Sequence, residues 1–360
     1  MKHRIILCVL AAALLVPPVF AADWNTQLAA NYLDSRQKEW FAWPGANKAM
    51  GGPCISCHTN MTYLLARPAL RHVLGEQHAT QYEQGLMDTM RARLDKRDPA
   101  EMFPTTKGRH GTEAVGVESI LATLFFVQQD AGKPLSAESR KAFDRMWDLQ
   151  LRDGKSAGAW TWNEFNLDPW EMPESTYYGA ALAAIAVGEA PVSYRAEANV
   201  RDRVTALVTY LQREQQAQPL HNKLLLLWAS SELPGIITDA AKKSLIAEVQ
   251  SKQDASGGWT LESLGPWEKH EHAPPAAGSN NYATGLTAFA LQKAGVKRSD
   301  PGMVKALAWL RTQQDAKTGS WAADSMNKDH DDPMTSRFMQ DAATAFAVMA
   351  LISPGVPGAR

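Results

Sequence analysis

The chain has 360 residues, of which 45% are apolar and 21% are charged, and its formal charge is −1 at pH 7. This composition is too hydrophobic for a disordered chain, and no strongly basic stripe indicates a nucleic-acid partner. The length allows either two domains of ordinary size or one large helical domain.

The first 21 residues have the features of a signal peptide. Lys2 and Arg4 give a basic start, an apolar run covers 5–15, and Val-Phe-Ala at 19–21 places small residues where a signal peptidase reads. We therefore expect cleavage after Ala21 and a mature protein that is exported to the periplasm. No later run approaches the ~18 apolar residues of a membrane-spanning helix, so no transmembrane segment is expected.

Helical periodicity fills most of the chain, and strand signals are scarce. Two kinds of helix alternate along the sequence. Amphipathic helices with one charged face are expected at 26–42, 78–97, 136–151, 195–216, 238–253 and 300–314. Short apolar helices, buried on all sides, are expected at 58–70, 112–129, 174–187, 221–232, 281–294 and 340–352.

The apolar segments recur every 47 to 62 residues, which indicates a repeat architecture. Six outer–inner pairs are enough to close a ring, so we expect an all-α fold, an (α/α)6 toroid of six outer-inner helix pairs. An open solenoid is the competing arrangement. The expected divisions are the signal peptide at 1–21, a helix pair carrying a cysteine motif at 22–75, the remaining pairs of the toroid at 76–352, and a tail at 353–360.

The loops that lead from the later outer helices to their inner helices share a second pattern. The fifth and sixth copies keep a glutamine, an aspartate, a glycine and a tryptophan in the same order: Gln253, Asp254, Gly257 and Trp259, then Gln314, Asp315, Gly319 and Trp321. The third copy keeps Trp147, Asp153, Gly158 and Trp160 with shifted spacing.

These loops resemble the glutamine–tryptophan repeats of the squalene-hopene cyclase and protein prenyltransferase superfamily, over roughly residues 136–352. The resemblance implies a terpenoid cyclase-like toroid with a central apolar cavity. It also implies that Gln and Trp tie the end of an outer helix to the start of the next inner helix. It does not by itself imply cyclase activity, because one fold supports many functions.

Beyond the signal peptide the only cysteines lie in the sequence Cys54-Ile55-Ser56-Cys57-His58. Two thiols at this spacing can form thioethers with both vinyl groups of one haem, and the adjacent imidazole then reaches the iron. We therefore predict one covalent haem c, attached to Cys54 and Cys57 and ligated by His58, at the mouth of the toroid cavity. Residues 51–71 are also similar to a group of exported bacterial proteins that join such a segment to cyclase-like repeats.

Three other roles of the cysteine pair stay open at this point. A thioredoxin-like redox pair normally lies in a βαβ setting, which the sequence lacks. A structural zinc site requires four Cys or His ligands, and the sequence has no second CxxC motif. The zinc site of the prenyltransferases cannot form in its family arrangement, because residues 59–360 contain no cysteine. A plain disulfide is compatible with an exported protein.

Further polar and sulfur-containing residues are candidates at the same end of the ring. His110 is the first candidate for a distal iron ligand or a distal-pocket base. Cations that could pair with the haem propionates are Arg67, Arg71, Lys107 and Arg109. Methionines that could supply a distal thioether are Met61, Met87, Met90 and Met102. Polar residues at the starts of the inner helices, Glu113 and Asp341 among them, could line a pocket or cap helices.

Two clusters suggest other chemistry. Asp329-His330-Asp331-Asp332 matches the DxDD acid motif of class II terpene cyclases, in which clustered carboxylates keep one proton. Pro333 and several further residues separate it from the next helix, which favours an Asp-rich loop. His270 and His272, with two glutamates, form a weak metal-like cluster. The two prolines beside this cluster indicate a surface loop.

Two classes of function follow from these features. In the first, the protein is a haem redox carrier or sensor that uses the toroid to dock a redox partner protein. In the second, it is a haem enzyme that presents a small hydrophobic, isoprenoid-like substrate to the iron. A haem-independent isoprenoid cyclase is a third interpretation. The sixth iron ligand separates the first two, because two strong protein ligands favour electron transfer.

Overall fold

The computed structural model describes residues 24–104, 108–268, 273, 277–327 and 332–352. Apart from two isolated β-bridges, the regular structure of these residues is helical. The outer helices are α1 (Thr26–Ala42), α3 (Gln81–Ala92), α6 (Ala137–Asp148), α9 (Ala198–Glu214), α11 (Asp239–Ser251) and α13 (Pro301–Thr312). The inner helices are α2 (Asn60–Leu74), α5 (Arg109–Gln129), α7 (Ser175–Glu189), α10 (Leu220–Glu232), α12 (Asn281–Lys293) and α14 (Phe338–Ile352).

The predicted alternation of outer and inner helices is confirmed. The remaining elements are short connections: α4 (Pro99–Met102), α8 (Val192–Arg195), η1 (Gln215–Ala217), η2 (Glu262–Leu264) and η3 (Thr335–Arg337). Five outer helices begin at a side chain that accepts a backbone N–H of the first turn, namely Asn25, Thr80, Ser136, Thr238 and Asp300. None of the helices in the described part of the chain is long and apolar enough to cross a membrane.

Most inner helices are buried around nearly their whole circumference, as their composition predicts, whereas α2 is only partly buried and exposes His72 and Val73 near its end. In α7 every residue from Tyr177 to Val187 is buried. Small residues let neighbouring inner helices approach closely. A methyl group added at Gly285 of α12 would lie 2.8 Å from the backbone nitrogen of Ala347 in α14. The outer helices instead bury one stripe, which in α13 consists of Met303, Ala306, Leu307 and Leu310.

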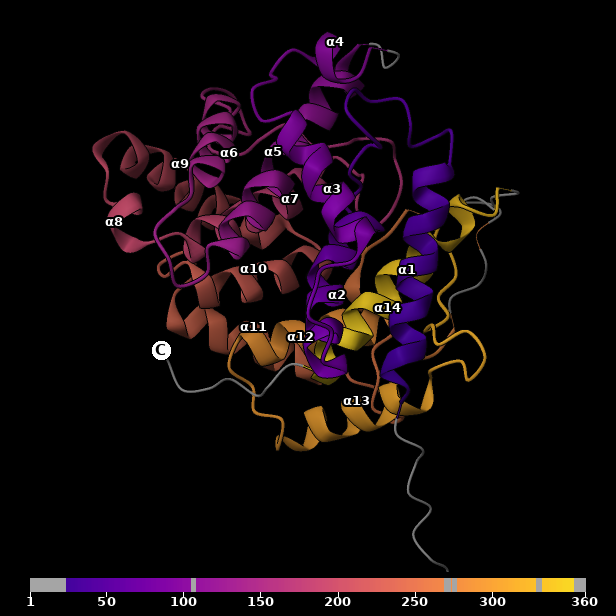
Figure 1. Cartoon of the computed structure of the whole chain (residues 1–360). Coiled ribbons are helices and arrows are strands. Elements are labelled where there is room, and N and C mark those ends of the chain that lie inside the picture. The colour runs from indigo at the N-terminus through magenta and orange to yellow at the C-terminus, as the bar shows by residue number, and fades with distance from the viewer. Residues whose placement is uncertain (1–23, 105–107, 269–272, 274–276, 328–331, 353–360) are drawn as a thin grey trace, which may run out of the picture.

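The ring is closed. The last inner helix, α14, packs against both α12 and the first inner helix, α2. Figure 1 shows the indigo helix α1 beside the yellow helix α14, so the first and last repeats meet. The fold is therefore the toroid and not the open solenoid.

The glutamine–tryptophan loops form the same bonds in three repeats. Each tryptophan indole N–H donates to a carbonyl of its own outer helix: Trp160 to Met146, Trp259 to Val249 and Trp321 to Leu310, at 2.6–2.8 Å. Each glutamine side-chain amide donates to the carbonyl of its own loop glycine. The same amide also donates to a backbone carbonyl of the next repeat: Gln150 to Arg203, Gln253 to Gly302 and Gln314 to Asn25, at 2.8–3.1 Å. The glutamine thus links successive outer helices, and the Gln314–Asn25 bond closes the circle.

The loop glycines explain why this contact is so close. Gly158, Gly257 and Gly319 have φ between 79° and 101°, where glycine is favoured. A methyl group added at Gly319 would lie 2.3 Å from the carbonyl carbon of Leu28 in α1. The sixth loop therefore packs on the first outer helix as the fifth loop packs on Lys305 of the sixth.

The inner helices all begin at one end of the ring and finish at the other. We call the first the motif end, because the Cys54–His58 segment leads into α2 there, and the second the far end. The packing between inner helices is loosest beside α2. Of the adjacent inner helices, α2 and α5 have the least direct contact, and the outer helix α3 packs against both.

Candidate functional site

The Cys54–His58 segment is held in place by the preceding loop. Gly51 and Gly52 have φ of 76° and 142°, and a methyl group at Gly52 would collide with the side chain of Thr89. The guanidinium of Arg93 donates to the carbonyls of Met50, Gly52 and Pro53 at 2.5–3.1 Å. Arg93 is itself buried against Glu118, so the loop is fixed by a buried ion pair.

Both cysteines are free thiols, but they are poor nucleophiles. Cys57 is fully buried, and burial raises its pKa well above the ordinary value. Burial also raises the pKa of Cys54 to about 12. A thioredoxin-like pair needs the opposite shift, because only the thiolate attacks a disulfide. These surroundings argue against a catalytic dithiol.

His58 lies in an aromatic box at the start of α2. Its ring stacks on Phe338 with centroids 3.9 Å apart, and Trp170 and Trp40 lie at 5.6 and 6.0 Å. Burial, with a smaller contribution from the positive charge of Arg36, lowers the pKa of His58 to about 3. The imidazole is therefore neutral at neutral pH, which is the state that ligates iron.

A hydrogen-bonded chain orients the His58 ring. The hydroxyl of Thr59 donates to Oδ2 of Asp341 at 2.9 Å, and its oxygen lies 2.9 Å from Nδ1 of His58. Because the hydroxyl proton is committed to the carboxylate, the Thr59 oxygen accepts from Nδ1–H. This arrangement puts the proton on Nδ1 and leaves the lone pair of Nε2 available, as in histidines that bind metals through Nε2.

Asp341 joins three helices at this point. Besides Thr59 it accepts hydrogen bonds from the hydroxyl of Tyr32 at 2.9 Å and from two guanidinium nitrogens of Arg36 at 2.7 and 3.0 Å. All of these groups are buried. The carboxylate that orients His58 through Thr59 is thus also the contact that ties α14 to α1 and α2. The sequence suggested only a pocket or capping role for Asp341.

The other predicted site residues separate into two groups. Arg109 and His110 lie at the motif end, on the first turn of α5. Nδ1 of His110 lies 2.8 Å from Glu113, the His110 ring packs on Phe165 at 4.6 Å, and Arg109 pairs with Glu164 at 3.0 Å.

Arg67 lies nine residues beyond His58 in α2, about 13 Å along the helix axis. It is buried and pairs with Asp34 and Glu76 at 3.0 and 2.6 Å. Arg71 pairs with Glu83 at the far end, and Lys107 lies outside the described residues.

Of the four candidate methionines, one packs beside Cys54. Met102 shares a small apolar cluster with Cys54, Phe103 and Val115. Met61 and Met90 belong to the main core, and Met87 lines a cavity at the far end. Met334, which sequence reasoning did not single out, packs with Trp40 and Cys54.

A carboxyl group near Cys57 also escaped the sequence analysis. Burial raises the pKa of the half-buried Glu171 to about 7, and the negative charge of Glu113 adds to the shift. Asn163 donates to Oε1 of Glu171 at 3.3 Å. Glu171 follows an irregular loop with no periodic pattern, so only the folded structure brings it near enough to Cys57 for its charge to raise the pKa of that thiol. A carboxyl group with this pKa can exchange a proton near neutral pH.

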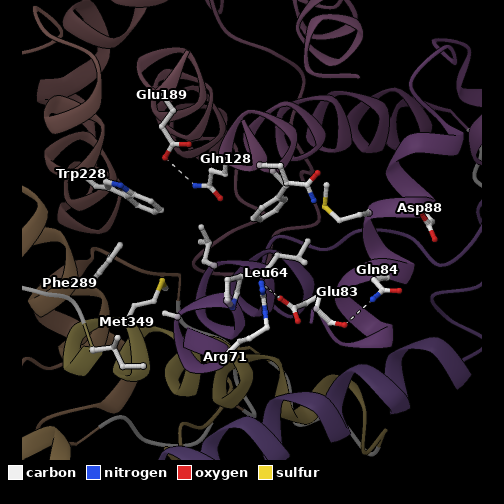
Figure 2. Close-up of a pocket in the computed structure, with 18 of the residues that line it drawn as sticks. Leu64, Arg71, Glu83, Gln84, Asp88, Gln128, Glu189, Trp228, Phe289 and Met349 are labelled. Carbon is white, nitrogen blue, oxygen red and sulfur yellow. Dashed lines mark hydrogen bonds and ion pairs between the residues drawn. The ribbon is translucent and has the colours of Figure 1, made fainter. Parts of the chain in front are cut away.

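Trp170, Tyr282 and His221 form a buried cluster between the inner helices. The indole of Trp170 donates to the hydroxyl of Tyr282 at 2.9 Å, and Nε2 of His221 lies 2.7 Å from the same hydroxyl. Burial lowers the pKa of His221 to about 4, so this ring is neutral. A cavity of about 620 Å³ opens at the far end of the ring, where Figure 2 shows it.

The remaining clusters fall largely outside the described residues. This applies to Asp329, His330 and Asp331 of the DxDD-like sequence, and to His270 and His272. Oδ1 of Asp332 accepts the backbone N–H of Met334 at 2.7 Å, which is a turn contact. Among the residues described, no group of three or more His, Cys, Asp and Glu side chains is placed to hold a metal ion.

No protein-family model matches the chain, and no curated protein matches it. Among solved structures, the chain is similar to the α-1,6-mannanase GH76A of Salegentibacter sp. HEL1_6, with a TM-score of 0.50, 10% identity and coverage of 91% of this chain and 100% of that chain. An inactive variant of that enzyme in complex with α-1,6-mannotetrose gives the same TM-score and coverage at 11% identity.

The ent-copalyl diphosphate synthase from Streptomyces platensis gives a TM-score of 0.32 and 16% identity, over 91% of this chain and 50% of that chain. The likeness to the mannanase supports the α/α toroid as the fold class and does not extend to activity.

Proposed function

We propose that this protein is an exported, periplasmic c-type haem protein. Cys54 and Cys57 would carry one covalent haem, His58 would ligate its iron, and the protein would act in electron transfer or redox chemistry at the motif end. The observation that carries the proposal is the chain from His58 through Thr59 to Asp341, which supports Nε2 as the ligand atom in the segment that holds both cysteines. A bound haem would supply an iron that cycles between two oxidation states.

The residues around His58 have roles of their own in this proposal. Thr59 and Asp341 hold the ring orientation and keep the proton on Nδ1. Phe338, Trp40 and Trp170 exclude water from the ring. A neutral, dry and fixed imidazole changes little between the two oxidation states, which favours electron transfer.

The test is expression with a haem c maturation system, followed by a pyridine haemochrome spectrum and the mass of the denatured protein. We expect one haem per chain that survives denaturation. Cys57→Ser should lower the covalent haem content sharply, and His58→Ala should remove the native spectrum. His72→Ala is the matched control, because His72 is an exposed histidine on the same helix. A chain without covalent haem, or equal spectra for His58→Ala and His72→Ala, would refute the proposal.

A second candidate, a haem enzyme acting on a small hydrophobic substrate, is favoured by one observation. Glu171 supplies a proton-exchanging group with a pKa of about 7 close to Cys57. The ferric spin state distinguishes the two candidates. A low-spin spectrum indicates two strong ligands and electron transfer, whereas a high-spin spectrum indicates an open iron site and catalysis. The haem-independent isoprenoid cyclase depends on the Asp329–Asp332 loop and ranks third.

A further inference from the structure

The far-end cavity is lined by the later turns of five inner helices and by the middle of α2. It has a volume of about 620 Å³, within the range of sites that bind small organic molecules. Every inner helix contributes to its lining: Pro68 and Leu64 from α2, Phe125 from α5, Glu189 from α7, Trp228 from α10, Phe289 from α12 and Met349 from α14. Outer helix α3 completes the wall where α2 and α5 diverge. In Figure 2, Trp228 and Phe289 lie on one side of the cavity and Gln84 and Asp88 on the other.

The cations of the lining already have partners. Arg71 pairs with Glu83 at 3.1 Å, and Arg91 pairs with Asp88 and Glu138. The ammonium of Lys293 pairs with Glu232 at 3.1 Å and lies about 6 Å from the ring centroids of Trp228 and Phe289. A further cation entering the cavity would be repelled by these side-chain cations. Lys293 also already occupies the position beside the Trp228 and Phe289 rings that would otherwise attract such a cation.

Glu189 is the acceptor of the lining that lacks a full set of partners, and two donors of the lining, Nε of Arg71 and Nε1 of Trp228, are also buried without a partner among the described residues. Glu189 is the last residue of α7, and its Oε1 accepts from the side chain of Gln128 at 3.1 Å. Oε2 is buried and has no hydrogen-bond partner among the described residues. Burial raises the pKa of Glu189 to about 7. A buried polar atom without a partner carries an energetic cost, which a ligand that donates a hydrogen bond would remove.

An ion of either sign would lose its hydration in this cavity, and the charges of the lining are already engaged. Arg71, Arg91 and Lys293 each pair with an acidic side chain, and the charge of Lys293 also favours the ionised form of Glu189. A carboxylate, a phosphate or an ammonium group would therefore meet no unpaired counter-charge. What remains is a neutral molecule with an apolar body and a hydroxyl group that can donate to Glu189.

We propose that the far-end cavity binds an uncharged, mainly apolar alcohol, with its chain against Leu64, Phe125 and Phe289 and its hydroxyl donating to Glu189. This inference goes beyond the proposed function and does not depend on a haem. The haem site and this cavity occupy opposite ends of the ring, so either assignment can fail without the other.

The test is titration calorimetry of the mature protein with three probes that share one chain length, 1-decanol, decanoate and decylamine, each below its aggregation concentration. We expect saturable binding of 1-decanol and binding of the other two that is weaker by about tenfold or more. Equal binding of all three, or no saturable binding of 1-decanol, would overturn the proposal.

Two variants and a control locate the site. Ala69→Trp places a bulky ring in the cavity wall and should abolish 1-decanol binding. Glu189→Leu removes the acceptor and should weaken binding by about tenfold. Val192→Ala changes an exposed residue outside the lining and should bind as the parent does. Circular dichroism and thermal melting check that each variant folds. Unchanged binding by a folded Ala69→Trp protein would place the probe elsewhere and contradict the inference.

Discussion

The motif end and the far end are made by the same six inner helices, yet their chemistry is opposite. At the motif end the helices begin, Trp170, Tyr282 and His221 form a buried hydrogen-bonded cluster, and His58 and His221 are neutral because they are buried. At the far end the helices finish, the axis is hollow, and Glu189 is left with an unpaired oxygen.

The difference has a structural origin. The motif end receives the long outer-to-inner connections, which bring aromatic residues such as Trp162 and Trp170 onto the axis. The far end is spanned by shorter connections, so helices rather than loops border its cavity. The Cys54–His58 segment and the far-end cavity therefore lie apart, so the position of one does not predict the position of the other.

The largest expected effect concerns the buried contact that joins the first and last repeats at the motif end. Asp341→Ala leaves Arg36 buried without its main partner, so we expect a loss of about 3–5 kcal/mol in the free energy of unfolding. Glu232→Ala, which breaks the more exposed pair with Lys293 at the far end, should cost about 1 kcal/mol or less. Urea unfolding of both variants measures the difference. Equal losses would show that the two ends are tied equally.

A smaller effect is expected from the loop glycines. Gly319 and Gly295 both have positive φ, at 79° and 101°, but only Gly319 packs against a neighbouring helix. Alanine at either position must adopt a left-handed backbone conformation, which lowers the free energy of unfolding by about 1–2 kcal/mol. Gly319→Ala adds the collision with Leu28. We therefore expect Gly319→Ala to lower the urea midpoint clearly more than Gly295→Ala. Similar midpoints would mean that the closing contact contributes little to stability.

The repeat pattern could be predicted because it is local. Helix α1 has the predicted bounds, since its apolar stripe and its cap at Asn25 lie within a few turns of sequence. Gln150 was missed because it lies ten positions before Trp160, whereas Gln253 lies six positions before Trp259. The contact from Asp341 to Thr59 spans 282 residues and leaves no periodic signal. The far-end cavity depends on how α3 packs between α2 and α5, which no local pattern encodes.

The smallest effect tests the orientation of His58 directly. Thr59→Val keeps the shape of the side chain but removes the oxygen that accepts Nδ1–H, so the imidazole becomes a weaker electron donor. In the haem-loaded protein we expect unchanged haem content and a higher reduction potential, because the oxidised iron loses stabilisation. Thr62→Val is the matched control, since the Thr62 hydroxyl bonds the backbone carbonyl of His58 and not its ring. Potentiometric titration of both variants decides the matter. Equal shifts would mean that the chain through Thr59 to Asp341 supports the fold of the motif end without tuning the iron ligand.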